Sequence, residues 1–467
     1  MITVSVGGNR AEMSEDFDVA VVGARCAGSP LAIKLARAGV RTVLIDKDEF
    51  PSDTPSTHFF QAEGLLSLQR LGVMERLKST GAPIISEAHN RIGDLVVRSR
   101  WPTRPGDVGG AMCVRRPVLD TILVQRAREV GVEVRTGTRA MSLIGNGRVR
   151  GVRVRDSTGR EVDVTARLVA GADGRGSLVA RQAGARAYNI TANERAGFWA
   201  YYDGVPITPP VTAYLHRWDE EFVIATPTDS GLFLVIVLAP VHRLPAFRAD
   251  SERTFEEHVA RDGVVSDIVA GHPRTGRLFS VLGFTGYFRE SAGPGWVLVG
   301  DAGHFKDPAP AQGISDALRQ VDRLAPAIIA GLGRGEAALD AETEQWWRWR
   351  DEDAAEKYWF AQDLGRGGPV PLVFAEMTGR LHEQGRITEL VDVFNHRRRP
   401  STVLTPARLL GAAARLSLRG DALSRQQILR ETRGMLSREM QRRRLNRQPV
   451  YAPMRQQETP AEIAVPA

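Results

Sequence analysis

Hydrophobic and polar positions follow two different periods along this chain, and together they predict a fold with two sheets. Residues 17–46 form an apolar run, a glycine-rich turn, a helical pattern and a second apolar run, which predicts one βαβ unit. Helical periodicity follows at 59–78 and 115–130, where leucines recur on one face. Residues 132–169 then alternate between turn sequences, which predicts a small antiparallel meander. This opening is typical of a doubly wound α/β domain.

The remaining pattern indicates that the first domain is interrupted. Residues 195–290 alternate apolar and polar positions between breaks rich in proline and glycine, as expected for a second antiparallel sheet. A buried-strand pattern near 295–300 and a helical pattern at 311–332 return to the first domain, and a mainly helical pattern follows. The predicted parts are a discontinuous Rossmann-like nucleotide-binding domain (1–185 and 286–345), an inserted substrate-binding β-sheet domain (186–285) and a C-terminal mainly helical region (346–467).

The composition is that of a packed globular enzyme. Of 467 residues, 43% are hydrophobic and 25% are charged, which suits two or three domains. No apolar run reaches the roughly 18 residues that span a membrane, and the first sixteen residues read as a loose polar leader without a secretory signal. Cys26 and Cys113 are too few for a disulfide framework or a metal site. We therefore expect a cytoplasmic protein without a metal.

The net charge of +7 is concentrated near the C-terminal end. From Gly411 onward there are 11 arginines and five acidic residues, which leaves the rest of the chain nearly neutral. Within this part, Leu429, Leu436 and Met440 form one stripe of an amphipathic basic helix. Packing on the body of the protein is the simpler explanation of that helix. Since no zinc finger or RNA-binding signature accompanies it, no nucleic-acid partner is expected.

The turn GARCAG at 23–28 has features of a dinucleotide-binding fingerprint. Gly23 closes the first strand, Gly28 lies where the helix must pack closely, and the helix start offers unpaired N–H groups to a pyrophosphate. Asp46 ends the next strand, where an acid binds a ribose 2′-hydroxyl. Arg25 replaces the second glycine, and we expect it to turn toward a phosphate. The alternative is a βα turn without a ligand. The predicted contacts are Gly23, Ala24, Arg25, Ala27, Gly28, Asp46 and Lys47.

Two later motifs favour a flavin nucleotide over the ligand-free alternative. They read GADGRGSLVAR (171–181) and GWVLVGDAGHFKDPAPAQGISDA (295–317). With the first turn, in this order and at these separations, they resemble the para-hydroxybenzoate hydroxylase-like (group A) superfamily of FAD-dependent monooxygenases over roughly residues 17–340. The segment FPSDTPSTHF (50–59) is also similar to bacterial flavoproteins related to halogenases and geranylgeranyl reductases. The resemblance makes the first domain an FAD-binding domain.

The resemblance implies roles for residues of the third motif. The Asp of the family's GD motif binds a ribityl hydroxyl of FAD, and Asp301 matches it. The segment beside the isoalloxazine ring maps onto Pro308, Gln312, Gly313 and Ile314. N–H groups there would stabilise negative charge on reduced flavin. This chain departs from the family at Pro310, where glycine is frequent, and at Ser315, where asparagine is frequent.

Two further residues are assigned by the same resemblance. Asp173 belongs to a DG motif that the family associates with both FAD and NAD(P)H. No second GxGxxG segment exists, so the pyridine nucleotide would bind only transiently. Arg116, four residues before Asp120, matches an arginine on a flavin-contacting helix. The alternatives are a tight turn at Asp173 and a surface charge at Arg116.

Candidates for contact with the substrate rest on residue type. His58 could face the flavin or the substrate as a catalytic group, although lone histidines are more often structural. Aromatic side chains of the second sheet could line a pocket, although at alternating spacing they usually belong to the core. The candidates are Trp199, Tyr201, His216 and Phe233.

The resemblance implies an FAD- and NAD(P)H-dependent monooxygenase. In that family O2 adds at flavin C4a, and the hydroperoxide passes one oxygen atom to an electron-rich substrate, here an aromatic or polyketide-like secondary metabolite. Halogenation is not expected, because FVIATPT at 222–228 lacks the WxWxIP segment of flavin-dependent halogenases. Two alternatives stay open: a reductase that saturates isoprenoid-type double bonds, and a non-catalytic flavin- or partner-binding protein.

Overall fold

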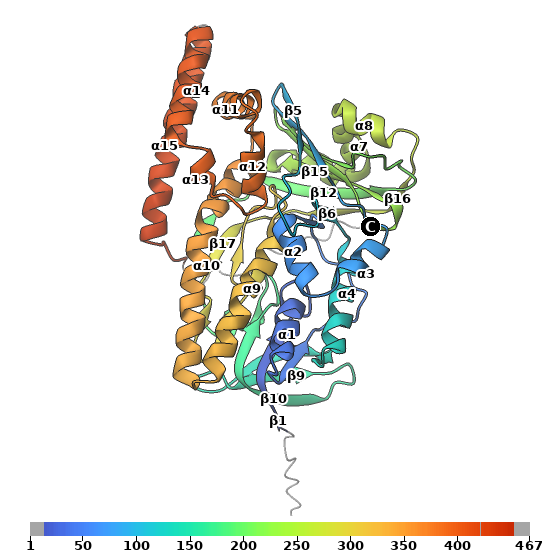
Figure 1. Cartoon of the computed structure of the whole chain (residues 1–467), viewed down its shortest axis with the longest axis vertical. Coiled ribbons are helices and arrows are strands. Elements are labelled where there is room, and N and C mark those ends of the chain that lie inside the picture. The colour runs from blue at the N-terminus through green and yellow to red at the C-terminus, as the bar shows by residue number, and fades with distance from the viewer. Residues whose placement is uncertain (1–13, 421, 453–467) are drawn as a thin grey trace, which may run out of the picture.

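The first sheet is mainly parallel and carries the glycine-rich turn. The structure is a computed structural model that describes residues 14–420 and 422–452 (Figure 1), so most of the leader lies outside the described residues. Its strands follow the order β18-β19-β10-β1-β2-β7, and β9 and β8 continue from β10 as an antiparallel meander. The bounds are β1 (Ser14–Val22), β2 (Thr42–Ile45), β7 (Glu133–Arg135), β8 (Arg139–Ile144), β9 (Gly151–Arg155), β10 (Glu161–Gly171), β18 (Ala292–Gly293) and β19 (Trp296–Leu298).

Three neighbouring strands of this sheet end side by side. β1 pairs in parallel with β10 so that Val22 lies opposite Gly171, and β10 pairs with β19 so that Gly171 lies opposite Leu298. The glycine-rich turn, the DG motif and the GD motif each follow one of these ends. Ligands of open parallel sheets bind beyond the carboxyl ends of the strands. The topology therefore gathers the three motifs at one edge.

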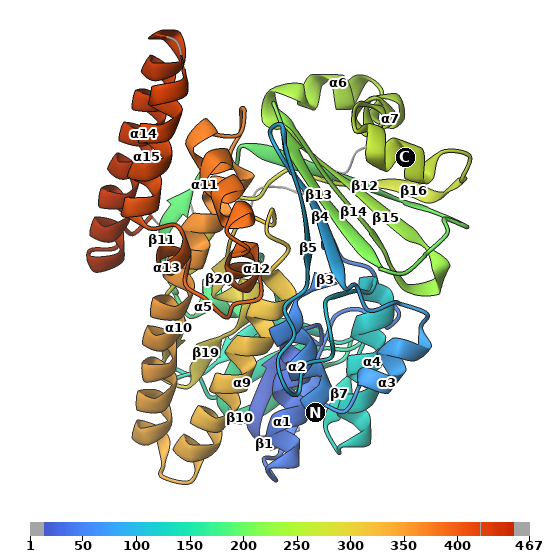
Figure 2. The same cartoon turned by 45° about the horizontal axis from the view of Figure 1, so that its top comes forward.

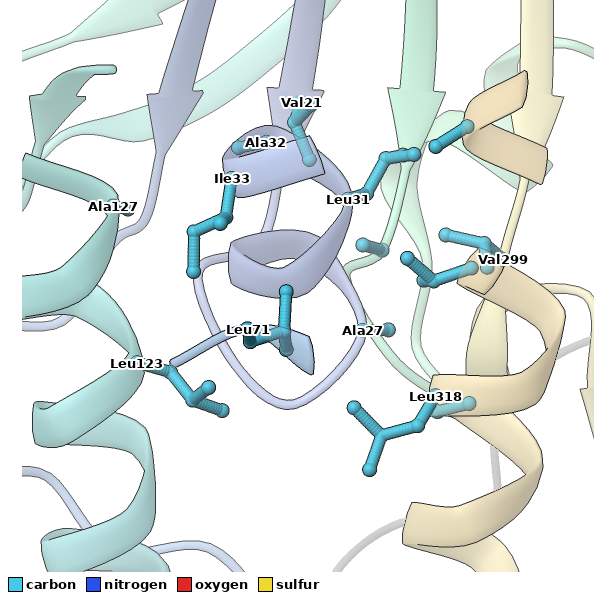
Figure 3. Packing of buried hydrophobic residues seen from close by; sticks show 14 of the residues in the cluster. Val21, Ala27, Leu31, Ala32, Ile33, Leu71, Leu123, Ala127, Val299 and Leu318 are labelled. Carbon is cyan, nitrogen blue, oxygen red and sulfur yellow. The ribbon is translucent and has the colours of Figure 1, made fainter. Parts of the chain in front are cut away.

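Helices pack on one face of the parallel sheet through a continuous apolar core (Figure 3). Leu31 and Ile33 of α1 are completely buried there, and each such side chain contributes about 1.5–3 kcal/mol by its burial. The meander and α5 cover the other face. The bounds are α1 (Gly28–Arg37), α4 (Arg116–Glu129), α5 (Leu178–Gln182), α9 (Gly313–Leu332) and α10 (Glu336–Gly365).

The helix predicted over 59–78 is broken into three elements. They are β3 (Phe59–Phe60), α2 (Ala62–Arg70) and α3 (Met74–Ser79), and β3 pairs with β6 (Met112–Cys113). Gly72 takes a φ of 73°, a left-handed conformation that separates the two helices. The leucine periodicity therefore predicted helical structure correctly over α2 and α3, but the break between the two helices and the short strand before them were missed.

The second sheet has seven strands, and helices α6 and α7 lie over one of its faces (Figure 2). Its order is β16-β12-β15-β14-β13-β4-β5. One face packs toward the first domain, while helices α6, α7 and α8 cover the other, so β12, β14 and β15 are buried along their whole length. The bounds are β12 (Arg195–Tyr202), β13 (Thr212–Trp218), β14 (Glu221–Pro227), β15 (Phe233–Pro240), β16 (Arg274–Val281), α6 (Leu244–Ala249), α7 (Ser251–Arg261) and α8 (Gly263–Val269).

A hairpin from the first part of the chain completes this second sheet. β4 (Glu87–Ile92) and β5 (Leu95–Arg100) join it through a parallel pairing of β4 with β13. Their residues fall inside the range predicted for the nucleotide-binding domain. A small third sheet of β11 (Ala187–Thr191), β17 (Gly286–Arg289) and β20 (His304–Phe305) lies where the chain enters and leaves the insertion.

The last part of the described chain is helical, as predicted. α14 and α15 contact each other and extend beside the body of the protein (Figure 1). Ile428 and Leu436 pack inward, whereas Leu429 and Met440 of the predicted stripe are exposed. Among the described helices, none is long and apolar enough to cross a membrane. The bounds are α11 (Leu372–Glu383), α12 (Ile387–Phe394), α13 (Pro400–Val403), α14 (Pro406–Arg419) and α15 (Ala422–Arg447).

Candidate active site

A cavity of about 820 Å³ opens where the three motifs meet, and it continues to the inner face of the second sheet. Twelve of the predicted residues line it: Gly23, Arg25, Ala27, Asp46, Lys47, Arg116, Asp173, Trp199, Asp301, Pro308, Gly313 and Ile314. Volumes of this size are typical of sites for small molecules and cofactors. Across residues 14–420 and 422–452, no group of acidic, His or Cys side chains could hold a metal ion.

Two glycines allow the tight geometry of the first turn. Gly23 has a φ of 103°, and a Cβ there would overlap the backbone of Ala172. A Cβ on Gly28 would overlap the carbonyl oxygen of Gly23. Only glycine fits either position, so strand and helix approach closely, and the first N–H groups of α1 stand at the cavity as an anion site. This cradle fits a pyrophosphate.

Asp46 supports this turn from within the protein. Its two carboxylate oxygens accept N–H groups of Ala24 at 2.6 Å and Asp48 at 2.9 Å. Burial raises the pKa of Asp46, against the effect of these two N–H donors. Lys47 is exposed at the rim of the cavity. The Asp46 carboxylate therefore holds the backbone of Ala24 in place, and Asp46 also lines the cavity.

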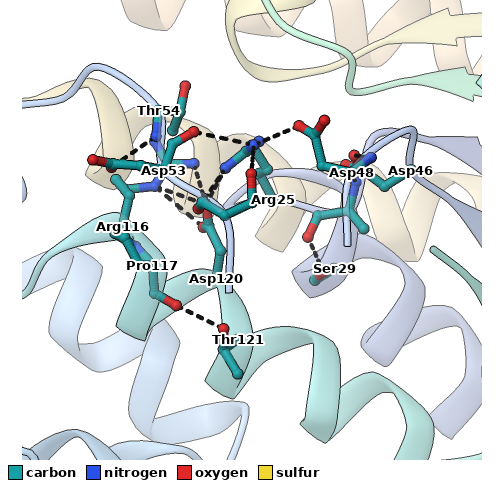
Figure 4. Close-up of polar contacts among 12 residues, drawn as sticks. Arg25, Ser29, Asp46, Asp48, Asp53, Thr54, Arg116, Pro117, Asp120 and Thr121 are labelled. Atoms are coloured by element: carbon teal, nitrogen blue, oxygen red, sulfur yellow. Dashed lines mark hydrogen bonds and ion pairs between the residues drawn. The ribbon is translucent and has the colours of Figure 1, made fainter. Parts of the chain in front are cut away.

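Arg25 binds protein carboxylates, which differs from the expected turn toward a phosphate (Figure 4). Its guanidinium reaches Asp48 at 2.9 Å, Asp120 at 3.1 Å and the hydroxyl of Ser52 at 3.0 Å. Asp120 also accepts the guanidinium of Arg116 at 2.9 Å. Although burial opposes it, the charge of Asp120 raises the pKa of Arg116. One carboxylate thus fixes two cationic side chains on the cavity wall, and its role was missed by the sequence reasoning.

Asp301 presents an unpaired carboxylate to the cavity. Among the described residues its side chain has no hydrogen-bond partner, and burial raises its pKa. A buried carboxylate without a donor is costly, so a ligand hydroxyl is a fitting partner. Asp301 follows Gly300, which has a φ of 62°. This group fits the ribityl chain of FAD.

The N-terminus of α9 forms a further part of the wall. Gly313 and Ile314 begin this 20-residue helix, whose first N–H groups lack intrahelical partners. The buried ammonium of Lys306 anchors this end by binding Asp316 at 2.8 Å and the side-chain oxygen of Gln312 at 2.7 Å. Burial lowers the pKa of Lys306, while Asp316 opposes that shift. The arrangement offers N–H donors to an anionic group.

Asp173 lines the cavity, but its carboxylate accepts hydrogen bonds from the protein itself. It accepts the hydroxyl of Ser177 at 2.5 Å and the N–H of Leu178 at 2.7 Å, which fixes the start of α5. Burial raises its pKa against these bonds. Contact of Asp173 with FAD or NAD(P)H stays a prediction.

His58 and Tyr201 form a buried pair behind the cavity. Nε2 of His58 and the hydroxyl of Tyr201 are 2.7 Å apart, which joins the segment before β3 to the second sheet. His58 is fully buried, has a φ of 58°, and has a pKa lowered to about 3, chiefly by burial. Neither residue is part of the cavity lining, whereas Trp199 beside them is. Within the described structure Nε1 of Trp199 has no hydrogen-bond partner.

His216 and Phe233 lie on the opposite face of the second sheet. Nδ1 of His216 bonds Asp262 at 2.6 Å and Nε2 bonds His89 at 2.7 Å, beneath α7 and α8. Phe233 belongs to the same outer cluster. Alternation along a strand shows which residues share a face but leaves open which face meets the cavity. Both residues therefore lie outside the candidate pocket, contrary to the prediction.

Several cavity residues inside the third motif were missed, and within the described structure Asp307 is the one with a carboxyl group that has an unused oxygen. Asp307 lines the cavity and has a pKa raised to about 7, chiefly by burial. The available signal was an acidic residue within the glycine- and proline-rich segment that the resemblance had already placed beside the flavin.

Comparison with known proteins supports the cofactor. Residues 16–345 match the FAD binding domain family. The chain is 26% identical over 340 residues to a 1H-pyrrole-2-carbonyl-(peptidyl-carrier protein) brominase of Pseudoalteromonas luteoviolacea, covering 68% of this chain and 78% of that protein. It is 28% identical over 341 residues to a 6-methylpretetramide 4-monooxygenase of Streptomyces rimosus, covering 69% and 78%. A flavin-dependent brominase solved as a triple mutant shares the fold with a TM-score of 0.72 and 19% identity, covering 85% and 99%.

Proposed function

Because this chain belongs to the FAD binding domain family, we propose that it is a monooxygenase that uses NAD(P)H and O2 to insert one oxygen atom into an aromatic or polyketide-like small molecule. The protein is an FAD-dependent oxidoreductase of the group A flavoprotein superfamily. The oxygenation, the reductant and the substrate class are what the proposal adds.

The observation that carries the proposal is the continuity of the cavity between cofactor motifs and an apolar wall. On the side of the second sheet it is lined by Trp199, Ile236, Leu238 and Phe284. Flat aromatic and aliphatic side chains suit a flat apolar substrate. A substrate that covers this wall would exclude water from it, which protects reactive oxygen chemistry from side reactions.

FAD, when bound, would supply the redox and oxygen-activating chemistry, and the chain's residues bind and orient. The first turn and the start of α1 would hold the phosphates, with Arg25 and Arg116 supplying positive charge nearby. Asp301 would accept a ribityl hydroxyl, and the N–H groups at the start of α9 would stabilise negative charge. Trp199 would orient the substrate. His58, which pairs with Tyr201 and contacts the ring of Trp199, would act as a positioning residue for Trp199.

The test follows the fate of oxygen. The purified protein is loaded with FAD, reduced anaerobically with NADPH or NADH, and exposed to 18O2 with a panel of phenols in the presence of bromide and chloride. We expect direct reduction of the flavin and one 18O atom in the product. Since a brominase is among the relatives, a halogenated product would replace the proposal with halogenation. A saturated product without oxygen would replace it with reduction. A protein that neither reduces its flavin with NAD(P)H nor forms a product would favour the non-catalytic alternative.

A matched pair of tryptophan variants tests the position of the substrate. Trp199 lines the cavity, whereas Trp218 is also buried but lies on the outer face of the same sheet. Trp199→Leu should raise the KM for the phenol or lower its conversion, while Trp218→Leu should leave both unchanged once the protein is folded. Equal effects of the two variants would contradict the assigned substrate wall.

A further inference from the structure

A carboxyl group with an unused oxygen stands in the cavity between the flavin motifs and the second sheet. Asp307 lies between β20 and α9 and lines the cavity. Its Oδ1 accepts the N–H of Ala309 at 2.9 Å. Among the described residues, Oδ2 has no hydrogen-bond partner. The free oxygen is therefore available to a molecule in the cavity.

The chain makes room for this carboxyl group at the end of α10. A Cβ on Gly365 would overlap the carboxyl group of Asp307, so the backbone there packs directly against it. The next carbonyl, of Arg366, accepts Nε of Arg195 at 3.2 Å and Nη2 of Arg217 at 2.9 Å. Two buried guanidinium groups thus lie behind Asp307 and bond to backbone oxygens, and within the described part of the chain the carboxyl group has no ion-pair partner.

The charges that face Asp307 come from several elements. Arg195 on β12, Arg217 on β13 and the Ala309 N–H favour its ionised form, whereas burial and the carboxylate of Glu194 disfavour it. Tyr358 of α10 also faces it, with a neutral hydroxyl bonded to the carbonyl of Asn189. The balance raises the pKa of Asp307 to about 7. Near neutral pH it exchanges a proton readily, which suits a general base.

We propose that Asp307 hydrogen-bonds a hydroxyl group of the substrate and accepts its proton, so that the substrates are phenols or enols. The substrate O–H bond breaks, the proton moves to Oδ2 of Asp307, and the electron pair stays on the substrate oxygen. The resulting phenolate is more electron-rich, which favours transfer of an electrophilic oxygen atom. This inference rests on the proposed function for its catalytic value, but binding of the hydroxyl does not depend on it.

The first test uses binding and needs no turnover. Oxidised, FAD-loaded protein is titrated calorimetrically at pH 7 with 2-naphthol or with its methyl ether, in two buffers of different ionisation enthalpy. The naphthol requires an ionised acceptor, so its binding should release about half a proton, because half of the Asp307 groups are protonated at a pKa of about 7. The ether can only accept, so its binding should take up about half a proton.

The controls separate Asp307 from other groups. Asp307→Asn should abolish both proton exchanges, while Asp267→Asn, which removes an exposed carboxylate on α8, should leave them as in the wild type. The comparison of proton release with the naphthol and proton uptake with the ether uses the wild-type protein alone, so it does not depend on the folding of a variant. Naphthol binding without proton release, or failure of the naphthol to bind, overturns the inference.

A second test uses the pH profile of oxygenation. The wild-type kcat/KM should rise with pH through about 7, and Asp307→Asn should lose this limb and fall by roughly 10²- to 10⁴-fold. If oxygenation persists unchanged in the variant, the proposed function stands and this inference fails. If the naphthol shows the expected proton release but no oxygenation occurs, the proposed function fails and the hydroxyl-binding role remains.

Discussion

Replacing Asp301 with Asn should change stability and cofactor binding in opposite directions. Burial raises the pKa of this carboxyl group, and no donor among the described residues compensates it. An acid whose pKa is higher in the folded than in the unfolded protein loses stability as the pH rises from the unfolded to the folded pKa, and the cost persists above that window. The neutral amide removes this cost. We therefore expect the FAD-free Asp301→Asn protein to be at least as stable as the wild type at pH 7.

The same change should weaken binding of FAD. A hydrogen bond to a charged group contributes about 1.5–3 kcal/mol, which corresponds to a roughly 10- to 140-fold loss of affinity. Affinity is measured by quenching of FAD fluorescence on titration of the apoprotein, and stability by urea unfolding of the same preparation. Asp267→Asn should change neither quantity. An unchanged FAD affinity, or an apoprotein less stable by more than about 1 kcal/mol, would refute the assigned role, because removal of a buried carboxylate without a donor should not destabilise the fold.

Three further predictions concern groups buried around the cavity. Gly28→Ala should destabilise the protein by about 3 kcal/mol or more and abolish FAD retention, because the new Cβ overlaps Gly23. Thermal melts measure the stability and flavin absorbance measures the retention. Gly263→Ala, in open space at the start of α8, should be tolerated in both measurements. His58, with a pKa lowered to about 3, stabilises the folded protein above its unfolded pKa of about 6.5, and this effect is lost as the pH falls toward 3. Between pH 6.5 and 5 the free energy of unfolding in urea should therefore fall by about 1.6 kcal/mol more for the wild type than for His58→Gln, and equal falls would contradict the buried neutral ring. Burial raises the pKa of Cys26 to about 11 and that of Cys113 to about 12. Mass spectrometry after treatment with iodoacetamide at pH 8 should therefore find buried Cys113 unmodified until the protein is denatured and Cys26, which lines the cavity, modified only slowly; rapid native labelling of Cys113 would count against the packing.

The sequence alone was sufficient for the fold class and the cofactor. The βαβ pattern at 17–46 and the glycines at positions 23 and 28 predict a nucleotide-binding α/β domain, and the resemblance of the three motifs to the group A superfamily implies FAD; the family match confirms both. These features are local, since a turn that permits only glycine and a strand that ends in an acid are visible without knowledge of distant contacts. The site residues within these motifs stay predictions, although the structure brings most of them to one cavity.

Only the tertiary structure decided which side chains face that cavity. Trp199 and His216 follow the same alternating pattern, yet the first lines the cavity and the second lies beneath α7 and α8, because a strand's period of two does not show which face a partner covers. Arg25 was expected at a phosphate and is instead held by Asp120, 95 residues away. Likewise, burial and the carboxylate of Glu194 raise the pKa of Asp307, and the carboxyl group itself packs against the backbone of Gly365. Contacts between residues distant in the chain depend on packing, and local sequence carries no record of them.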